Sequence, residues 1–340
     1  MEGMMEMPAD SLAVRPDQMD AGPTDTRGRS VTVCICTHER TGYLRTCLDS
    51  LRQQTVGLDG FTIVVVDSCS GPEAAAEIAR LVAAMPNATL VRADILGISL
   101  ARNAGARAAT GDYVAYIDDD AQAAPDWVEQ IMRVVAEAPA RPAVLGGRAL
   151  PIWEAPLPAW WPDKLIGVLT ITEWEGRGEY RTKEVPEGLG PYGANFIVER
   201  EALLAMGGFL EDLGRRGNML LSDEDVHLAW ALQDSGRSTR HDARIVVHHC
   251  IQAQRLTPKW LLNRLYWQGA STVATRRLLG KPQQVWRELP RRLAVAVLFA
   301  PAALIPSRSS IALGLRWRLA YALGYCRMAL WQPTEYAARS

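Results

Sequence analysis

Residues 111–120 read Gly-Asp-Tyr-Val-Ala-Tyr-Ile-Asp-Asp-Asp and constrain the fold more than any other stretch of the chain. The apolar run from Tyr113 to Ile117 has the length and the β-branched or aromatic character of a buried strand. A strand that ends in three carboxylates delivers them to the edge of a sheet, where open α/β folds bind ligands. Like charges repel unless water or a cation compensates them, and oxygen ligands suit Mg²⁺ or Mn²⁺. A solvated acidic turn is the alternative for these residues taken alone.

Strands and helices alternate along the chain before this segment. Apolar runs predict strands at 31–36, 61–66 and 89–92, and helical periodicity predicts helices at 43–51, 73–85 and 99–110. The resulting β-α-β-α-β-α-β order requires right-handed crossovers and predicts an α/β fold with a mostly parallel sheet flanked by helices. No G-x-G-x-x-G follows the first strand, which argues against a dinucleotide-binding fold of the Rossmann type.

Several polar residues occupy positions where such folds bind ligands. Those that fall just after expected strand ends, and can therefore converge on one crevice, are Thr37, Glu39, Asp67 and Asp120. Gly97 and Arg102 lie at the start of an expected helix, where an anionic diphosphate can be bound. For each residue alone, a capping or surface role is the alternative.

Charge is divided unevenly along the chain. From Arg255 onward there are 14 Lys and Arg residues and two acids, a net charge of +12, whereas the remainder carries −13. Such a division predicts two roles within one chain. The six cysteines show no C-x-x-C spacing, so we expect a reducing cytosol and no disulfide framework. Residues 1–29 lack the basic and apolar regions of a signal peptide, and their composition predicts a disordered tail.

The basic C-terminal part contains two apolar segments. Residues 293–306 form a run of 14 residues that includes Pro301, shorter than the roughly 20 residues that span a bilayer. Arginines border this run, and a second segment at 311–331 carries further arginines with Trp and Tyr. These patterns predict helices on the inner-membrane surface, with a paired re-entrant insertion as the open alternative. We expect no nucleic-acid binding, because the basic residues lie in an apolar tail.

The stretch 150–190 departs from the regular α/β pattern, since prolines and tryptophans punctuate it. Sugar faces and lipid-like groups both stack well on indole rings. An acceptor-side loop and the packing of an irregular insert are equally compatible with this composition.

Seven segments in a fixed order carry a family resemblance. The first four are Cys34-Ile-Cys-Thr-His-Glu-Arg40, Val64-Val-Val-Asp67, Gly97-Ile-Ser-Leu-Ala-Arg-Asn-Ala-Gly105 and Tyr116-Ile-Asp-Asp-Asp120. The last three are Tyr192-Gly-Ala-Asn-Phe-Ile-Val-Glu-Arg-Glu-Ala202, Gly207-Gly-Phe209 and Ser222-Asp-Glu-Asp-Val-His-Leu228. Over residues 31–270, roughly, the chain resembles family 2 glycosyltransferases of the GT-A fold, of the type that builds exopolysaccharides and cell envelopes.

The resemblance implies a role for each matching residue. Those that match the nucleotide-sugar site are Thr37, Glu39, Asp67, Gly97, Arg102, Asp118 and Asp119. Asp120 matches a ligand of a Mg²⁺ or Mn²⁺ ion, and a histidine after a late strand often completes the metal site. His248 and His249 compete for that place, and the spacing to Arg255 favours His249. Glu224 and Asp225 match the family's E-D pair, whose aspartate is the catalytic base; an N-capping cluster is the alternative there.

These roles imply an inverting single displacement. One sugar would move from a nucleotide-diphospho-sugar, with UDP favoured over GDP, to a hydroxyl of a glycan or lipid-linked sugar acceptor. The cation would neutralise the leaving diphosphate while Asp225 takes the proton of the attacking hydroxyl. Processive relatives carry Q-x-x-R-W and several membrane spans, whereas here Leu313 stands where the glutamine would precede Arg316-Trp317, so we expect addition of a single sugar.

Two other functions stay open at this point. A sugar-1-phosphate nucleotidyltransferase shares the α/β fold and acidic metal site, but needs a Gly-rich loop that residues 36–40 do not offer. The second is a non-catalytic membrane-bound protein with a degenerate transferase domain. In domain terms we expect a disordered tail over 1–29 and a GT-A catalytic domain over 30–255. A basic, apolar helical region over 256–340 would attach this cytoplasmic protein peripherally to the membrane.

Overall fold

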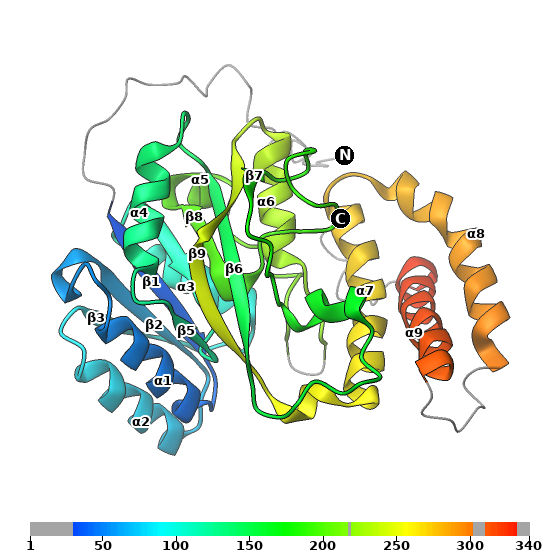
Figure 1. Cartoon of the computed structure of the whole chain (residues 1–340), viewed down its shortest axis with the longest axis horizontal. Helices are drawn as coiled ribbons and strands as arrows, with labels where there is room; N and C mark the ends of the chain where they lie inside the picture. Colours follow the sequence, from blue (N-terminus) through cyan, green and yellow to red (C-terminus); the bar gives the residue numbers. More distant parts are fainter. Residues whose placement is uncertain (1–29, 217–218, 302–309, 332–340) are drawn as a thin grey trace, which may run out of the picture.

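The structure, a computed structural model, describes residues 30–216, 219–301 and 310–331. The tail predicted for residues 1–29 lies outside the described residues, as does part of the apolar run at 293–306. A central sheet carries helices on both faces, and a layer of three C-terminal helices packs at one side (Figure 1).

The first half of the sheet follows the predicted alternation. Its elements are β1 (Val31–Thr37), α1 (Thr41–Arg52), β2 (Thr62–Ser68), α2 (Pro72–Ala83), β3 (Ala88–Ala93), α3 (Ile98–Ala108) and β4 (Tyr113–Tyr116). β2 pairs with β1 and β3, and β1 pairs with β4, all in parallel register. Each crossover contains a helix, as parallel neighbours require.

The second half is less regular. Its elements are β5 (Ala121–Ala123), α4 (Trp127–Glu137), β6 (Val144–Trp153), β7 (Arg177–Glu179), β8 (Phe196–Glu199), α5 (Arg200–Ala205), α6 (Glu224–Asp234) and β9 (Thr239–Ile251). The strand order is β3-β2-β1-β4-β8-β6-β9-β5, and β7 pairs with β9. β8 runs antiparallel to both β4 and β6.

The predicted α/β class is confirmed, but the expectation of a mostly parallel sheet is wrong for this half. The connection from β6 to β8 is the irregular insert and not a single crossover helix, so the rule that makes neighbouring strands parallel does not apply. β5 likewise begins a few residues after β4 and pairs antiparallel with β9. The sheet is therefore mixed.

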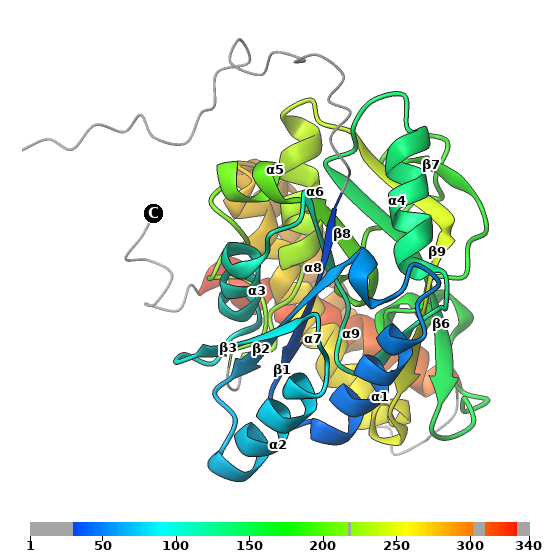
Figure 2. The same cartoon turned by 90° about the vertical axis from the view of Figure 1, so that its left-hand side faces the viewer.

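Two cores bury the two faces of the sheet. Along β2, Ile63 and Val65 face the core shared with α1, α2 and α4, whereas Val64 and Val66 face the core shared with α3, α5 and α6. In Figure 2, α1 and α2 lie on one face of the strands β1, β2 and β3, and α3 lies on the other face. Because successive side chains of a strand alternate between faces, a strand buried on both sides reads as a continuous apolar run. This is why β1, β2 and β4 were predictable.

The C-terminal layer consists of α7 (Pro258–Leu278), α8 (Pro282–Phe299) and α9 (Ser310–Leu330). α7 lies between the sheet domain and the pair formed by α8 and α9 (Figure 1). α7 and α9 cross closely at Gly269 and Gly324, where a Cβ on either glycine would overlap the backbone of the facing helix. No helix among the described residues combines the length and apolar character that crossing a membrane requires.

Candidate active site

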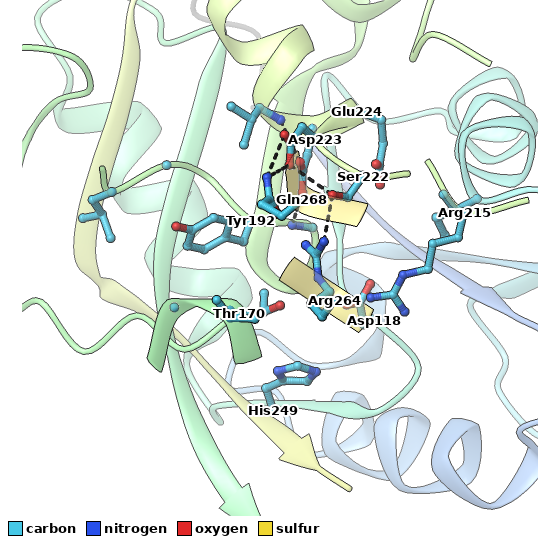
Figure 3. A pocket seen from close by; sticks show the side chains of 18 of the residues that line it. Asp118, Thr170, Tyr192, Arg215, Ser222, Asp223, Glu224, His249, Arg264 and Gln268 are labelled. Carbon is cyan, nitrogen blue, oxygen red and sulfur yellow. Dashed lines mark hydrogen bonds between the residues drawn. The ribbon is translucent and has the colours of Figure 1, made fainter. Parts of the chain in front are cut away.

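One pocket of about 1440 Å³ opens at the carboxyl edge of β1 and β4. Its walls come from the turns after these strands, the start of α3, the 164–193 insert, the start of α6, the end of β9 and one face of α7. Asp120 and Asp225 both line it, so the acids from the two halves of the chain meet in one cavity. Figure 3 shows Asp118 and His249 on one side of this pocket and Ser222, Asp223 and Gln268 on another.

The side chain of Asp119 contacts Thr37 at the end of β1 and the guanidinium of Arg40. Its two carboxylate oxygens accept hydrogen bonds from Thr37 Oγ1 and Arg40 Nη1, each at 2.7 Å. Burial raises the pKa of Asp119 to about 7, although Arg40 opposes the shift. With both oxygens occupied, Asp119 orients Arg40 at the floor of the pocket.

Asp120 is almost fully buried and surrounded by donors. Its Oδ2 accepts hydrogen bonds from Arg40 Nη2 at 2.5 Å, Gln252 Nε2 at 2.6 Å and Arg255 Nη2 at 3.0 Å. Its Oδ1 lies 3.4 Å from His249 Nε2. Burial alone would raise the pKa of Asp120, but His249 and the two arginines hold it well below its usual range. The carboxylate therefore stays ionised, with Oδ1 left for another ligand.

Asp118, Asp120 and His249 form a cluster that fits a divalent cation. One ligand atom from each residue lies within 4.8 Å of the other two. His249 is buried, and its Nδ1 has no hydrogen-bond partner among the described residues. Two carboxylates and one imidazole are a donor set that Mn²⁺ and Mg²⁺ accept. The residues present thus fit the predicted metal.

Strand pairing explains why His249 and not His248 reaches the cluster. β5 follows Asp120 directly, and Ala121 pairs with His249 across the β5–β9 ladder. The Cys250 N–H also donates to the Asp120 carbonyl at 2.8 Å. Because neighbours on a strand face opposite sides, His248 points away, and it is not among the residues that line the pocket.

Arg102 connects the cation cluster to the E-D pair. Its Nη1 donates to Glu224 Oε1 at 2.7 Å, and its Nη2 lies 3.7 Å from Asp118 Oδ1. Burial opposes the charge of Arg102, but Glu224 and Asp225 outweigh burial and raise its pKa. A Cβ at Gly193 would overlap the guanidinium, so a side chain there would displace Arg102 from this position. The predicted contact of Arg102 with the donor stays a prediction.

Asp225 is the second residue of α6 and is buried against the insert. Its Oδ2 accepts from the Gly193 N–H at 2.6 Å and its Oδ1 from the Val226 N–H at 2.7 Å. Burial and then the neighbouring charge of Glu224 raise the pKa of Asp225 to about 7. A carboxylate with this pKa can accept a proton near neutral pH and is suited to general-base catalysis.

The turn that presents the E-D pair is held by α7. Asp223 adopts a left-handed conformation, φ 78°, which is uncommon for a residue with a side chain. Both of its carboxylate oxygens accept from Gln268 Nε2, at 3.0 and 2.9 Å. The Ser222 N–H donates to Ser271 Oγ at 2.9 Å, and Arg264 Nη1 donates to Ser222 Oγ at 3.2 Å. α7 therefore fixes the backbone from which Asp225 projects.

Arg264 and Gln268 are functional candidates that the sequence reasoning missed. Both belong to the region 256–340, which was expected to serve only membrane association. A usable signal exists, since the two polar residues are spaced i, i+4 and share one face of a helix that is otherwise rich in buried apolar residues.

The predicted nucleotide residues are not all at the surface of the pocket. Thr37 and Gly97 line it, together with Arg102 and the three aspartates. Glu39 and Asp67 instead accept hydrogen bonds from the Gly71 N–H at 2.5 Å and the Ser70 N–H at 2.9 Å. These two acids shape the turn after β2 and are not among the lining residues. Their contact with a base or ribose stays a prediction.

The aromatic residues of the irregular insert divide between the wall of the pocket and the packing of the insert, and an acceptor-side role stays a prediction. Trp174 lines the pocket, as do Lys164 and Thr170 of the same insert. Trp161 is buried and packs with apolar residues of α7, including Leu261. The insert is therefore both a pocket wall and a packing layer between β6 and the C-terminal helices.

Comparison with known proteins gives one family. Residues 32–189 match the family model of glycosyl transferase family 2. The chain is 32% identical over 176 residues to a glucosyl-dolichyl phosphate glucuronosyltransferase of Haloferax volcanii, a match that covers 52% of this chain and 54% of that protein. It is 24% identical over 253 residues to the succinoglycan biosynthesis protein ExoM of Rhizobium meliloti, covering 70% and 72% of the two chains. The chain thus spans about half the length of the first relative.

A solved structure shares the fold. A mannosyltransferase from Pyrobaculum calidifontis, solved in complex with GDP-Man and Mn²⁺, matches with a TM-score of 0.58 at 19% sequence identity. The match covers 94% of this chain and 90% of that one. The predicted GT-A architecture is confirmed.

Proposed function

Because residues 32–189 match the family model of glycosyl transferase family 2, we propose that this chain transfers one sugar from a nucleotide-diphospho-sugar to a hydroxyl group, with inversion at the anomeric carbon. One observation carries the proposal: Asp120 and Asp225 line the same pocket, the first at a cation-binding cluster and the second at a buried position suited to a base. The donor we assign is a UDP-sugar, with a GDP-sugar second. The acceptor we assign is a glycan or a lipid-linked sugar.

The chain's own residues supply positioning and proton transfer. Arg40 and Arg255, both bound to Asp120, present positive charge where the diphosphate of the donor would lie. Asp225 accepts the proton of the acceptor hydroxyl as its oxygen attacks the anomeric carbon. The new C–O bond forms on the face opposite to the C–O bond that breaks, and the electron pair leaves with the nucleoside diphosphate. Attack from the opposite face inverts the configuration.

Glu224 and Arg102 keep this base in its working state. Glu224 is buried beside Asp225 and raises its pKa, while the guanidinium of Arg102 limits the shift. A Mg²⁺ or Mn²⁺ ion at Asp118, Asp120 and His249 would supply Lewis-acid neutralisation of the leaving diphosphate.

A panel of radiolabelled nucleotide-sugars, incubated with membrane lipid extract, tests the function. We expect one donor to give label in the organic phase, or in a glycan fraction if the acceptor is soluble. Calorimetry with UDP or GDP and Mn²⁺ is run beside it. Absence of metal-dependent nucleotide binding, together with absence of transfer, would overturn the proposal and favour a non-catalytic protein.

We also propose that the C-terminal layer attaches the protein peripherally to the cytoplasmic face of a membrane. Large apolar side chains are exposed on α8 and α9 and at the residue after α9: Trp286, Leu293, Val297, Leu298, Leu323, Leu330 and Trp331. Arg287 and Arg291 are exposed on the same helix as Val297. Apolar side chains that penetrate the headgroup region, bordered by arginines that attract anionic lipids, suit such a surface.

A further inference from the structure

Two arginines on the base side of the pocket have no carboxylate partner within the part of the chain that the structure describes. Arg215 and Arg264 both line the cavity. Arg264 is half-buried, and its hydrogen bond is to the Ser222 hydroxyl at 3.2 Å. Among the described residues, neither guanidinium lies in an ion pair, whereas Arg40, Arg102 and Arg255 all do. Figure 3 shows both side chains reaching into the pocket between Ser222 and His249.

The electrostatics of this pair are unfavourable as they stand. Burial lowers the pKa of Arg264, and the positive charge of Arg215 lowers it further, against the individually weaker pulls of Asp223, Glu224 and Asp225. Two neighbouring cations repel each other, and a bound anion removes that repulsion while accepting their N–H groups. The pair is therefore built to receive negative charge.

The location of Arg264 separates this site from the donor diphosphate, whereas the charge of Arg215 acts on both Arg264 and Arg255. Arg40 and Arg255 lie at Asp120, at the cation cluster. Arg264 instead lies at Ser222, three residues before the base Asp225. The pocket, at about 1440 Å³, is also larger than the roughly 300–1,000 Å³ of an ordinary small-molecule site, so it has room for a second substrate.

We propose that Arg215, Arg264 and the Ser222 hydroxyl form a second anion subsite that binds a phosphate group of the acceptor. The guanidinium groups donate to the phosphate oxygens, and this contact places a sugar hydroxyl of the same acceptor against Asp225. The assignment to the acceptor rests on the proposed transferase function; the binding of phosphate does not.

Calorimetry with inorganic phosphate tests the subsite, in the presence of Mg²⁺ and a saturating nucleoside diphosphate, UDP or GDP. We expect phosphate to bind while the nucleotide is in place. Arg264→Met and Arg215→Met should each weaken phosphate binding at least tenfold and change nucleotide affinity less than twofold. Lys183→Met is the control, because Lys183 is an exposed cation elsewhere on the pocket lining, and it should change phosphate affinity less than twofold.

Three outcomes would overturn the subsite. Phosphate fails to bind the full chain, or bound nucleotide displaces it, or Arg264→Met weakens nucleotide and phosphate equally, which would assign the arginines to the donor. The variant Arg215→Met keeps the test decisive if Arg264→Met does not fold, because Arg215 is exposed. Arginine-dependent phosphate binding without any nucleotide binding would preserve the subsite and reject the transferase. Competition by dodecyl phosphate or by glycerol phosphate then distinguishes a lipid phosphate from a soluble phosphate ester.

Discussion

Asp225 changes its charge near neutral pH, and the transfer rate should follow. Its pKa is raised to about 7 by burial and by Glu224. The base must be ionised to accept a proton, so kcat/KM should fall tenfold per pH unit below about 7 and level off above it. Asp119 also has a pKa raised to about 7. Asp119→Asn is therefore the control, and the acid limb should survive in it; a pH-independent rate in this variant would assign the limb to Asp119.

Replacement of the base should separate chemistry from binding. Asp225→Asn keeps the shape of the side chain but removes the proton acceptor, so transfer should fall by about 10²–10⁴-fold. Donor affinity, measured by calorimetry, should stay within twofold. Transfer at the rate of the unaltered chain would contradict the assignment of Asp225 as the base.

The same variant should also be more stable at alkaline pH. The folded pKa of Asp225 is about 7, above the roughly 3.9 of an unfolded aspartate, so ionisation disfavours the folded chain. That cost is fully present above pH 7 and disappears as the pH falls toward 4. Thermal unfolding should show Asp225→Asn with a higher Tm than the unaltered chain at pH 8, and a difference that shrinks at pH 4.5. An equal difference at both pH values would contradict this.

The two adjacent histidines offer a matched pair for the cation. His249 faces Asp118 and Asp120, whereas His248 is outside the pocket. His249→Ala should raise the Mn²⁺ concentration for half-maximal transfer about tenfold or more, because one of three ligands is lost. His248→Ala removes the same ring one residue away and should leave that concentration within twofold. Equal effects of the two variants would reject the cluster.

At the scale of elements, α7 is the support on which the E-D turn rests. Gln268 donates to both oxygens of Asp223, and Asp223 holds an uncommon left-handed conformation directly before α6. Without this contact the turn keeps only its bonds at Ser222, and the base projects from a less restrained backbone. Gln268 thus acts through Asp223 and is a positioning residue.

Gln268→Met tests this role, since methionine fills a similar volume without a donor. We expect kcat to fall about tenfold while the KM for the donor and the Tm stay near their original values. Thr272→Val is the control on the same helix. It removes the acceptor of the Tyr321 hydroxyl and the donor to the Gln268 carbonyl, but leaves the Gln268 side chain on Asp223, so kcat should be unchanged. A parallel loss of Tm and kcat in Gln268→Met would indicate a structural role only.

The elements also show what sequence could and could not predict. β1 to β4 were predictable because local apolar periodicity and helical crossovers determine parallel pairing. The place of β8 was not, because it pairs with β4 across more than 80 residues of chain and its connection from β6 is irregular. The contact of Gln268 with Asp223 is equally non-local, 45 positions apart. Of the motif residues predicted after strand ends, Thr37 and Asp120 line the pocket and Glu39 and Asp67 do not, whereas Arg264 and Gln268 of α7 line it without having been predicted.

At the scale of the whole molecule, the uneven charge does not separate two independent roles. α7 begins at Pro258 in the basic region, yet it supplies Arg264 and Gln268 to the pocket. The boundary at residue 255, between a catalytic domain and a membrane-associating region, therefore stays a prediction. α8 and the outer face of α9 are the parts of the layer that present exposed apolar side chains.

Membrane attachment should depend on those exposed side chains. Val297 and Leu298 are 76% and 70% exposed on α8. The double variant Val297→Asp, Leu298→Asp should lose co-sedimentation with anionic phosphatidylglycerol vesicles, and raised salt should weaken binding of the unaltered chain. Tm should be unaffected, because neither side chain is buried. A double variant that binds these vesicles as well as the unaltered chain would reject the surface.

The glycine crossing of α7 and α9 limits how this chain can be rebuilt. At Gly269 and Gly324 the two helix backbones are too close to accommodate a side chain. Another face of α7 forms a wall of the pocket. A chimaera whose α8 and α9 come from another protein must therefore supply a helix that packs against α7 at the same short backbone distance. A bulkier residue at either crossing point would push the helices apart and tilt α7. The tilt would disturb the hydrogen bonds from Gln268 to Asp223, far from the point where the two chains are joined.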